Sequence, residues 1–362
     1  MTLADIESKL SAGERLTQED AVFLFSEAPS NWLRQAADRA RRKRHGEVAF
    51  YNRNIHFEPT NICVYACRFC AFARKLGDSA ENGAWDHPIA ELEATLERYP
   101  VGSLSEVHIT GGVHPERGVE YGEALCKAVK TRRPEIHVKA FTAVEISFFA
   151  RKSGLSPKEC LERLKAAGLD SLPGGGAEIF DPEVRKKIAG GKAPAHQWLE
   201  IHETAHGLGI QSNATMLYGH VEEHRHRVDH MARLRELQDR TGGFMSFIPL
   251  RFRRENNELS DIHEVSPEED LRTFAVARLF LDNIPHLKAY WVMLGVPLAQ
   301  EALDWGVDDL DGTVDDSTKI YSMAGAEEKS PTLSSDRIRQ IITEKGRVPT
   351  ERDSWYRPIP KV

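Results

Sequence analysis

Short apolar runs alternate with helical patterns along most of the chain, and this alternation limits the possible folds more than any other feature. Eight runs have the character of strands, at residues 55–58, 107–110, 137–142, 169–173, 211–217, 244–249, 286–291 and 308–311. Helical patterns lie between or after them, at residues 88–99, 118–132, 156–167, 195–208, 222–239, 266–283 and 296–304. Strand-then-helix repetition is typical of a parallel sheet. Eight units predict an α/β protein, a (β/α)8 TIM-type barrel that is fully or nearly closed, with a doubly wound open sheet as the alternative.

Segments at both ends of the chain fall outside this alternation. Residues 1–48 hold two helical patterns, at 3–25 and 31–45, and predict an N-terminal helical cap. Residues 49–312 form the predicted barrel. Residues 313–362 contain one helical pattern near 334–345 and predict a C-terminal extension packed on the barrel.

Composition argues against several classes of protein. A net charge of -7 does not suit non-specific nucleic-acid binding, which depends on basic patches. The basic run at residues 39–45 closes a predicted helix, where cations favour the helix dipole. No apolar run approaches the ~20 residues that span a bilayer, and the N-terminus lacks the pattern of a secretory signal. We therefore expect a cytoplasmic protein that binds neither nucleic acid nor membrane.

Three of the five cysteines, Cys63, Cys67 and Cys70, lie within eight residues directly after the first predicted strand. Thiolates select iron–sulfur clusters, zinc or copper(I). A structural zinc site or an ordinary cubane takes four protein ligands, and the sequence offers no obvious fourth. Three thiolates on a four-iron cluster would leave one iron open to bind a small molecule and pass it an electron. Cys126 and Cys160 lie in helical patterns and are expected to be buried apolar residues.

The spacing C-x3-C-x-F-C resembles the signature of the radical S-adenosylmethionine (SAM) superfamily. In that family, three cysteines hold a 4Fe-4S cluster, and the amino and carboxylate groups of SAM chelate its fourth iron. The resemblance implies that Cys63, Cys67 and Cys70 are the metal ligands and catalytic residues, and that Phe69 packs by the adenine. It also implies a cytosolic electron donor such as flavodoxin or ferredoxin.

Glycines and polar residues follow several predicted strands, at the end where barrel enzymes place their sites. Glycine lets a backbone approach a ligand closely, although tight turns are the alternative reading. In radical SAM barrels, a Gly-Gly pair at the place of Gly111 and Gly112 contacts the amino group of SAM. We expect cofactor contacts from Gly111, Gly112, Glu145, Glu178, Asn213 and Thr215.

Longer segments within residues 50–350 make the resemblance more specific. HFEPTNICVYACRFCAF, KAFTAVEI, GLDSLPGGGAEIF, SNATMLYGH and LDNIPHLKAYW are similar to the aminofutalosine synthase family of the futalosine route to menaquinone. The implied reaction adds the 5'-deoxyadenosyl radical to the vinyl carbon of 3-[(1-carboxyvinyl)oxy]benzoate. Aryl migration and loss of carbon dioxide then give 6-amino-6-deoxyfutalosine, so SAM is a consumed co-substrate and the enzyme is a transferase. A related radical SAM cyclase acting on dehypoxanthine futalosine is the alternative.

A substrate with two carboxylates requires cationic groups near the barrel mouth, and arginine forks suit carboxylates. Arg251, Arg253 and Lys288 are the candidates at predicted strand ends, with His220 and Tyr290 as polar neighbours. Ordinary salt bridges at the barrel mouth are the alternative role for these side chains.

A second motif points to another class of enzyme. His202, Glu203 and His206 match the H-E-x-x-H pattern of zinc hydrolases, and Glu222 could supply a third ligand. However, Trp198 begins the buried stripe of a helix on the outside of the predicted barrel, which would place both histidines away from the mouth. A zinc hydrolase is therefore the alternative from a different class.

Overall fold

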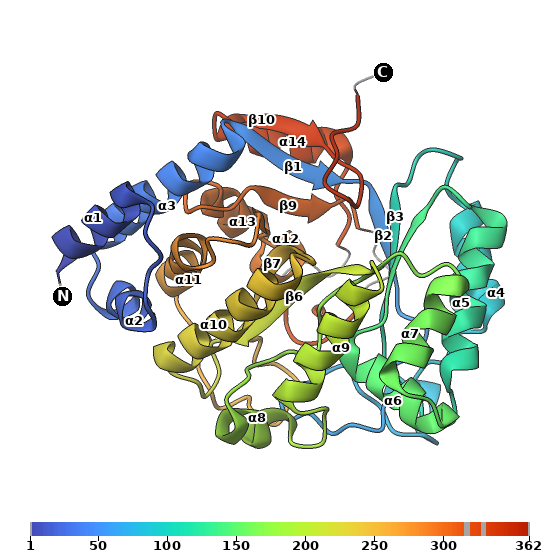
Figure 1. The fold of residues 1–362 in the computed structure, drawn as a ribbon. Coiled ribbons are helices and arrows are strands. Elements are labelled where there is room, and N and C mark those ends of the chain that lie inside the picture. The colour runs from blue at the N-terminus through green and yellow to red at the C-terminus, as the bar shows by residue number, and fades with distance from the viewer. Residues whose placement is uncertain (1, 315–318, 327–330, 361–362) are drawn as a thin grey trace.

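Seven parallel strands form the central sheet of the computed structural model, which describes residues 2–314, 319–326 and 331–360 (Figure 1). The sheet curls into a half-barrel, which confirms the predicted α/β barrel class. Neighbouring strands follow the order of the chain. They are β2 (Asn54–Phe57), β3 (Glu106–Ile109), β4 (His137–Ala140), β5 (Ser171–Leu172), β6 (Gln211–Tyr218), β7 (Phe244–Arg251) and β8 (His286–Leu287).

Helices cover the outer face of this sheet (Figure 1). Side chains alternate along each strand, so Val107 and Ile109 of β3 are fully buried in the core while Glu106 and His108 line the interior. The helices are α4 (Ile89–Glu97), α5 (Val119–Arg132), α6 (Ala143–Ser153), α7 (Pro157–Ala166), α8 (Pro182–Ala189), α9 (Ala195–Gly207), α10 (His224–Thr241), α11 (Pro267–Phe280), α12 (Trp291–Leu294) and α13 (Val296–Ala302), with a 3-10 turn at Ala80–Asn82.

Three helices precede the first strand, namely α1 (Leu3–Ala12), α2 (Gln18–Ser26) and α3 (Ser30–His45). The single helix expected over residues 3–25 is thus two helices. Gly13 ends α1 because it adopts the left-handed conformation, with φ of 72°, and Thr17 starts α2 by a capping box with Asp20.

A second, three-stranded parallel sheet lies beside the first (Figure 1). Its order is β10 (Val348–Glu351), β1 (Val48–Asn52) and β9 (Asp309–Gly312). The strand predicted at 308–311 therefore forms, but it pairs along β1, and one bridge from Lys288 to Asp309 connects it with the end of β8. Arg352 donates to Asp309 at 2.6 Å and so neutralises one carboxylate of this acidic strand. Among the described residues, the barrel sheet has seven regular strands rather than eight.

The helix predicted near residues 334–345 forms as α14 (Ser335–Glu344) and is followed by β10. Met1 of the predicted cap and residues 315–318, 327–330 and 361–362 of the predicted extension lie outside the described residues. Within the described part of the chain, no helix is both long and apolar enough to cross a membrane.

Candidate active site

A cavity of about 260 Å³ lies inside the curled sheet, where the loops after strands β2–β8 converge. Every residue expected to bind the cluster, SAM or the substrate lines this cavity, except His220. The lining residues of that set are Cys63, Cys67, Phe69, Cys70, Gly111, Gly112, Glu145, Glu178, Asn213, Thr215, Arg251, Arg253, Lys288 and Tyr290.

The three cysteines lie on a loop after β2, and backbone hydrogen bonds and the side chain of Arg74 hold this loop in shape. The Cys63 amide donates to the Arg74 carbonyl at 2.8 Å, and the Cys70 amide donates to the Cys67 carbonyl at 3.0 Å. The Arg74 guanidinium donates to the carbonyls of Asn82, Ala71, Phe72 and Ala73, so it ties the loop to the segment that follows. Nothing in the sequence pattern singled out Arg74 for this role.

The Gly111-Gly112 turn after β3 packs directly against the cysteine loop. The Gly112 amide donates to the Thr60 carbonyl at 2.7 Å. A Cβ on Gly111 would lie 2.6 Å from the Thr60 carbonyl oxygen, and one on Gly112 would lie 2.4 Å from that of Ile62. Real Cβ atoms do not approach backbone so closely, so glycine is required here for the loop itself to sit against the strand end.

The donor set of this loop fits an iron–sulfur cluster. The three cysteines are free and half-buried. All three line the cavity, and thiolates are the ligands that hold iron–sulfur clusters. Burial raises the pKa of Cys67 to about 11 and also raises that of Cys70, with the Lys192 ammonium opposing both effects.

Lys192, which the sequence reasoning missed, lies beside the cysteines. Its Nζ is 2.5 Å from Glu178 Oε1 and 5.3 Å from the centre of the Phe69 ring. Burial lowers the pKa of Lys192, but the electrostatic attraction of the Cys67 sulfur and of Glu178 outweighs that effect and raises the pKa overall. Burial by itself would raise the pKa of Glu178, but the Lys192 ammonium more than offsets this effect, so the pKa of Glu178 is lowered overall. Both groups are therefore charged.

Glu145 stands at the start of α6, where it forms a capping box with Thr142. Its Oε2 accepts hydrogen bonds from the Thr142 amide at 2.7 Å and from the Thr110 hydroxyl at 3.3 Å. Burial nevertheless raises the pKa of Glu145 to about 7. The Glu145 carboxyl lines the cavity, and its protonation state changes near neutral pH.

Three glycines after β5 bring the backbone close to its neighbours. Gly174 has a φ of +84°, and a Cβ there would lie 2.2 Å from the Asn213 carbonyl oxygen. The Thr215 hydroxyl donates to the Gly174 carbonyl at 2.7 Å, and Asn213 Oδ1 accepts from Ser246 at 2.8 Å. These contacts make Thr215 a support of the glycine loop as well as a cavity-lining residue.

The expected substrate-binding cations all have acidic partners. Arg251 and Arg253 lie 3.2 Å from Glu264, and Lys288 Nζ lies 2.7 Å from Asp311. The Tyr290 hydroxyl lies 3.4 Å from His56 Nδ1.

His220 is not brought to the cavity. Its imidazole is buried 3.0 Å from Glu222, which also pairs with Arg227 at 2.8 Å. The residue therefore braces the turn between β6 and α10.

The H-E-x-x-H motif lies on α9, on the outside of the sheet, and its members do not line the cavity. His202 Nδ1 and His206 Nε2 both lie within 2.9 Å of the Ser212 hydroxyl, while Glu203 pairs with Arg240 at 3.0 Å. The two imidazoles thus anchor the helix to β6, and the glutamate points to a different partner, so the arrangement does not support a zinc hydrolase.

A parallel half-barrel that presents three cysteines beside an internal cavity is the architecture of a radical SAM enzyme. The model of the radical SAM superfamily matches residues 57–234, and the model of the CofH/MqnC C-terminal region matches residues 241–362. Aminodeoxyfutalosine synthase of Thermus thermophilus is 47% identical over 99% of this chain and 96% of that protein. The chain belongs to the radical SAM superfamily, in the branch that contains the aminodeoxyfutalosine synthases.

Related enzymes share this likeness at lower identity. Cyclic dehypoxanthine futalosine synthase of Streptomyces coelicolor is 39% identical over 98% of this chain and 88% of that protein. Among solved structures, the FeFe-hydrogenase maturase HydG from Carboxydothermus hydrogenoformans aligns with a TM-score of 0.75 and 19% identity, over 98% of this chain and 80% of that chain. The structural likeness shows the shared fold.

Proposed function

We propose that the chain is an aminodeoxyfutalosine synthase, a transferase that joins the 5'-deoxyadenosyl group of SAM to 3-[(1-carboxyvinyl)oxy]benzoate with aryl migration and loss of carbon dioxide. The product is 6-amino-6-deoxyfutalosine, which serves menaquinone biosynthesis. The observation that carries the proposal is the 47% identity to such a synthase over nearly the whole of both chains. The three cysteines at the cavity are consistent with it.

Cys63, Cys67 and Cys70 would hold a 4Fe-4S cluster beside the cavity. When bound, that cluster supplies the electron that cleaves SAM, which is consumed as co-substrate. We assign Phe69, Gly111, Gly112, Glu145, Glu178, Asn213 and Thr215 to the SAM side of the cavity, and Arg251, Arg253, Lys288 and Tyr290 to the substrate side. Lys192 is added to the SAM side, because its ammonium lies near Glu178 and the thiolates.

The protein's remaining task is to hold two reactants together and keep water away. Positioning of reacting atoms contributes strongly to rates, and closed sites prevent side reactions of radicals. Ile320, Tyr321 and Ala324 of the C-terminal extension line the cavity together with the barrel residues. The amides of Lys319 and Ile320 donate to the Glu58 carboxylate at 2.8 and 3.3 Å, which fastens this segment to the end of β2.

A soluble one-electron donor, flavodoxin or ferredoxin, would reduce the cluster, and the protein would act in the cytoplasm on a small molecule without nucleic acid or membrane as partner. The overall charge of -7 is consistent with the lack of a nucleic-acid partner.

One anaerobic assay tests the proposal. The protein reconstituted with iron and sulfide receives SAM, dithionite and 3-[(1-carboxyvinyl)oxy]benzoate, and mass spectrometry follows the products. We expect an adenosine-containing adduct of the benzoate together with methionine. Cys67→Ala should abolish the adduct, whereas Cys126→Ala, a matched change of a fully buried cysteine outside the cavity, should retain it.

Two outcomes would contradict the proposal in different ways. Release of 5'-deoxyadenosine without an adduct would keep the radical SAM assignment and favour a reaction of the cyclase type. Intact SAM in a protein shown to hold a reduced cluster would overturn the role assigned to the three cysteines.

A further inference from the structure

One layer of the half-barrel interior is polar, where barrels of this class of fold usually carry branched apolar side chains. His56 of β2, His108 of β3 and Lys139 of β4 are direct neighbours across three strands in register, and all three line the cavity. Lys288, directly after β8, lines it as well. The register therefore places four nitrogen-bearing side chains inside the sheet, before the strand ends that carry the cysteine loop.

Two buried ion pairs complete this group. Lys139 Nζ lies 2.6 Å from Glu106 Oε2, and Lys288 Nζ lies 2.7 Å from Asp311 Oδ1. These lysine side chains are only 5% and 2% exposed. Each ammonium has three donors, and among the described residues each has one hydrogen-bond acceptor. Donor capacity is therefore left over beside the cavity.

Two buried nitrogen atoms without hydrogen-bond partners also indicate unused donor or acceptor capacity beside the cavity. Nδ2 of Asn54 and Nε2 of His108 have no hydrogen-bond partner among the described residues, although both residues line the cavity. Burial lowers the pKa of His56 to about 4 and lowers the pKa of His108 well below its usual range, so both imidazoles are neutral at neutral pH. A buried polar atom without a partner is costly, and a ligand that pairs with it removes that cost.

We name His56, His108, Lys139 and Lys288, with their carboxylates Glu106 and Asp311, the polar layer. We propose that the polar layer binds the ring carboxylate of the substrate, the carboxylate remote from the vinyl carbon. This assignment rests on the proposed function, which supplies a substrate with two carboxylates. An ammonium that already has one acidic partner can still donate to a second carboxylate, and charge-assisted hydrogen bonds are the stronger kind.

The position of the reacting carbon decides which of the two carboxylates reaches the polar layer. The vinyl carbon must lie near the cysteine loop, beyond the end of β2. The vinyl carboxylate is bonded to the carbon next to it and stays near the mouth, where Arg251 and Arg253 line the cavity. The ring carboxylate lies across the aryl ring and extends inward, toward Lys139 and Lys288.

A binding comparison tests the proposal without turnover. The cluster-loaded protein, unreduced and saturated with SAM, is titrated by equilibrium dialysis with 3-[(1-carboxyvinyl)oxy]benzoate and with 2-phenoxyacrylate, the same molecule without the ring carboxylate. We expect the wild-type protein to bind the dicarboxylate about 10- to 100-fold more tightly, the usual range for hydrogen bonds to a charged group.

The double variant Glu106→Gln with Lys139→Gln removes both charges of one pair together, so no buried charge is left alone. In this double variant, the preference for the dicarboxylate over 2-phenoxyacrylate should fall to about 3-fold or less. Lys130→Gln with Asp170→Asn is the matched control, because that pair also spans 2.6 Å but does not line the cavity. The control should keep the wild-type ratio.

Lys288→Gln with Asp311→Asn gives a second, independent test should the first variant fail to fold. Equal binding of the two ligands by the wild-type protein, or an unchanged preference in a folded polar-layer variant, would overturn the proposal. Failure of the proposed function is a separate result, since it would appear as the absence of any adduct in the assay with the wild-type enzyme.

Discussion

Glu145 shows how one residue serves both the local fold and the site. Its carboxylate caps α6 through the Thr142 amide, and the same group reaches Thr110 at the end of β3. Because burial outweighs these hydrogen bonds, the pKa of Glu145 rises to about 7. A folded-state pKa above the unfolded one means that the folded protein binds this proton more tightly. The resulting stabilisation is complete below about pH 4.5 and is lost as the pH rises through 7.

Glu145→Gln should therefore flatten the pH dependence of stability. Glutamine at this position still accepts the capping hydrogen bond but cannot ionise. In thermal unfolding of the cluster-free protein, the wild type should lose stability between pH 5 and pH 8 relative to the variant. The difference should be on the order of 3 kcal/mol at most, taking about 1.4 kcal/mol per pKa unit. Identical profiles for the two proteins would contradict the raised pKa.

At the scale of elements, the cysteine loop owes its shape to the strand turn behind it. The loop has little regular structure of its own, and its backbone is fixed by hydrogen bonds to neighbours such as Val113, whose carbonyl accepts from the Val64 amide at 2.9 Å. Gly112 allows the two segments to meet. The glycine pair therefore matters to the position of the thiolates, whatever else it contacts.

Gly112→Ala should displace the cysteine loop, because the new Cβ would lie 2.4 Å from the Ile62 carbonyl oxygen. We expect lower iron content per chain after reconstitution and a loss of about 1–3 kcal/mol in unfolding free energy, the usual cost of overpacking. Gly207→Ala is the control, since that helical glycine has nothing within 4 Å of the added Cβ. It should leave iron content unchanged and stabilise the protein by about 0.5–1 kcal/mol. Full iron loading of Gly112→Ala would refute this account.

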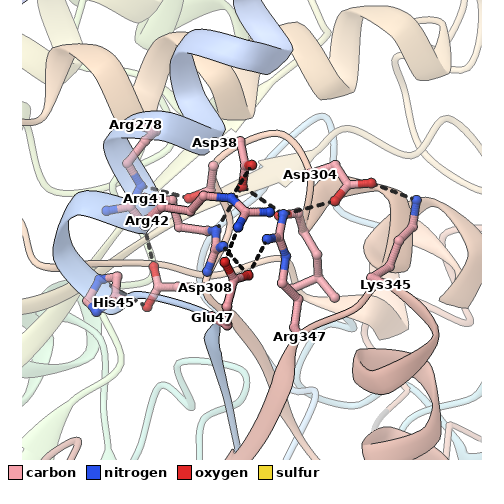
Figure 2. Close-up of polar contacts among 12 residues, drawn as sticks. Asp38, Arg41, Arg42, His45, Glu47, Arg278, Asp304, Asp308, Lys345 and Arg347 are labelled. Atoms are coloured by element: carbon pink, nitrogen blue, oxygen red, sulfur yellow. Dashed lines mark hydrogen bonds and ion pairs between the residues drawn. The ribbon is translucent and has the colours of Figure 1, made fainter.

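At the scale of the whole molecule, Arg347 connects segments that are distant in the sequence. Figure 2 shows its guanidinium among Asp38 and Glu47 of the N-terminal part and Asp304 after α13. The distances are 2.7, 2.8 and 3.0 Å, and the arginine side chain is 2% exposed. Lys345 also bonds Asp304, at 3.0 Å, so the acid lies between two cations. This network joins the N-terminal helix α3, the segment after α13 and the second sheet.

Arg347→Met should therefore weaken the entire protein. Removing one partner of a buried pair costs about 3–5 kcal/mol, and the partial exposure of the three carboxylates reduces that figure to about 2 kcal/mol. Urea unfolding should show one transition at lower denaturant concentration. Arg357→Met provides the control, because its side chain is 73% exposed and its change should stay within about 0.5 kcal/mol. Equal midpoints for the two variants would show that the network contributes nothing to stability.

Local patterns in the sequence were enough to predict the cysteine loop, the glycine turns and the parallel barrel class. Apolar periodicity, capping residues and ligand spacing act over a few residues, so they can be recognised without the tertiary structure. The same reasoning placed Cys63, Cys67 and Cys70 after a strand, where the structure has them lining the cavity. The buried stripe that begins at Trp198 also predicted that the helix of His202 lies outside the barrel interior.

Contacts between distant segments were decided by the tertiary structure alone. Lys192 stands among glycines and alanines in the sequence, and only folding brings it to Glu178 and the cysteines. The polar layer extends from His56 to Asp311, and sheet register selects which side of each strand faces inward. A slip of one residue would turn those side chains toward the helices. The sequence by itself thus determined the chemistry of the loop and the repeating units, whereas long-range pairing determined the cavity around them.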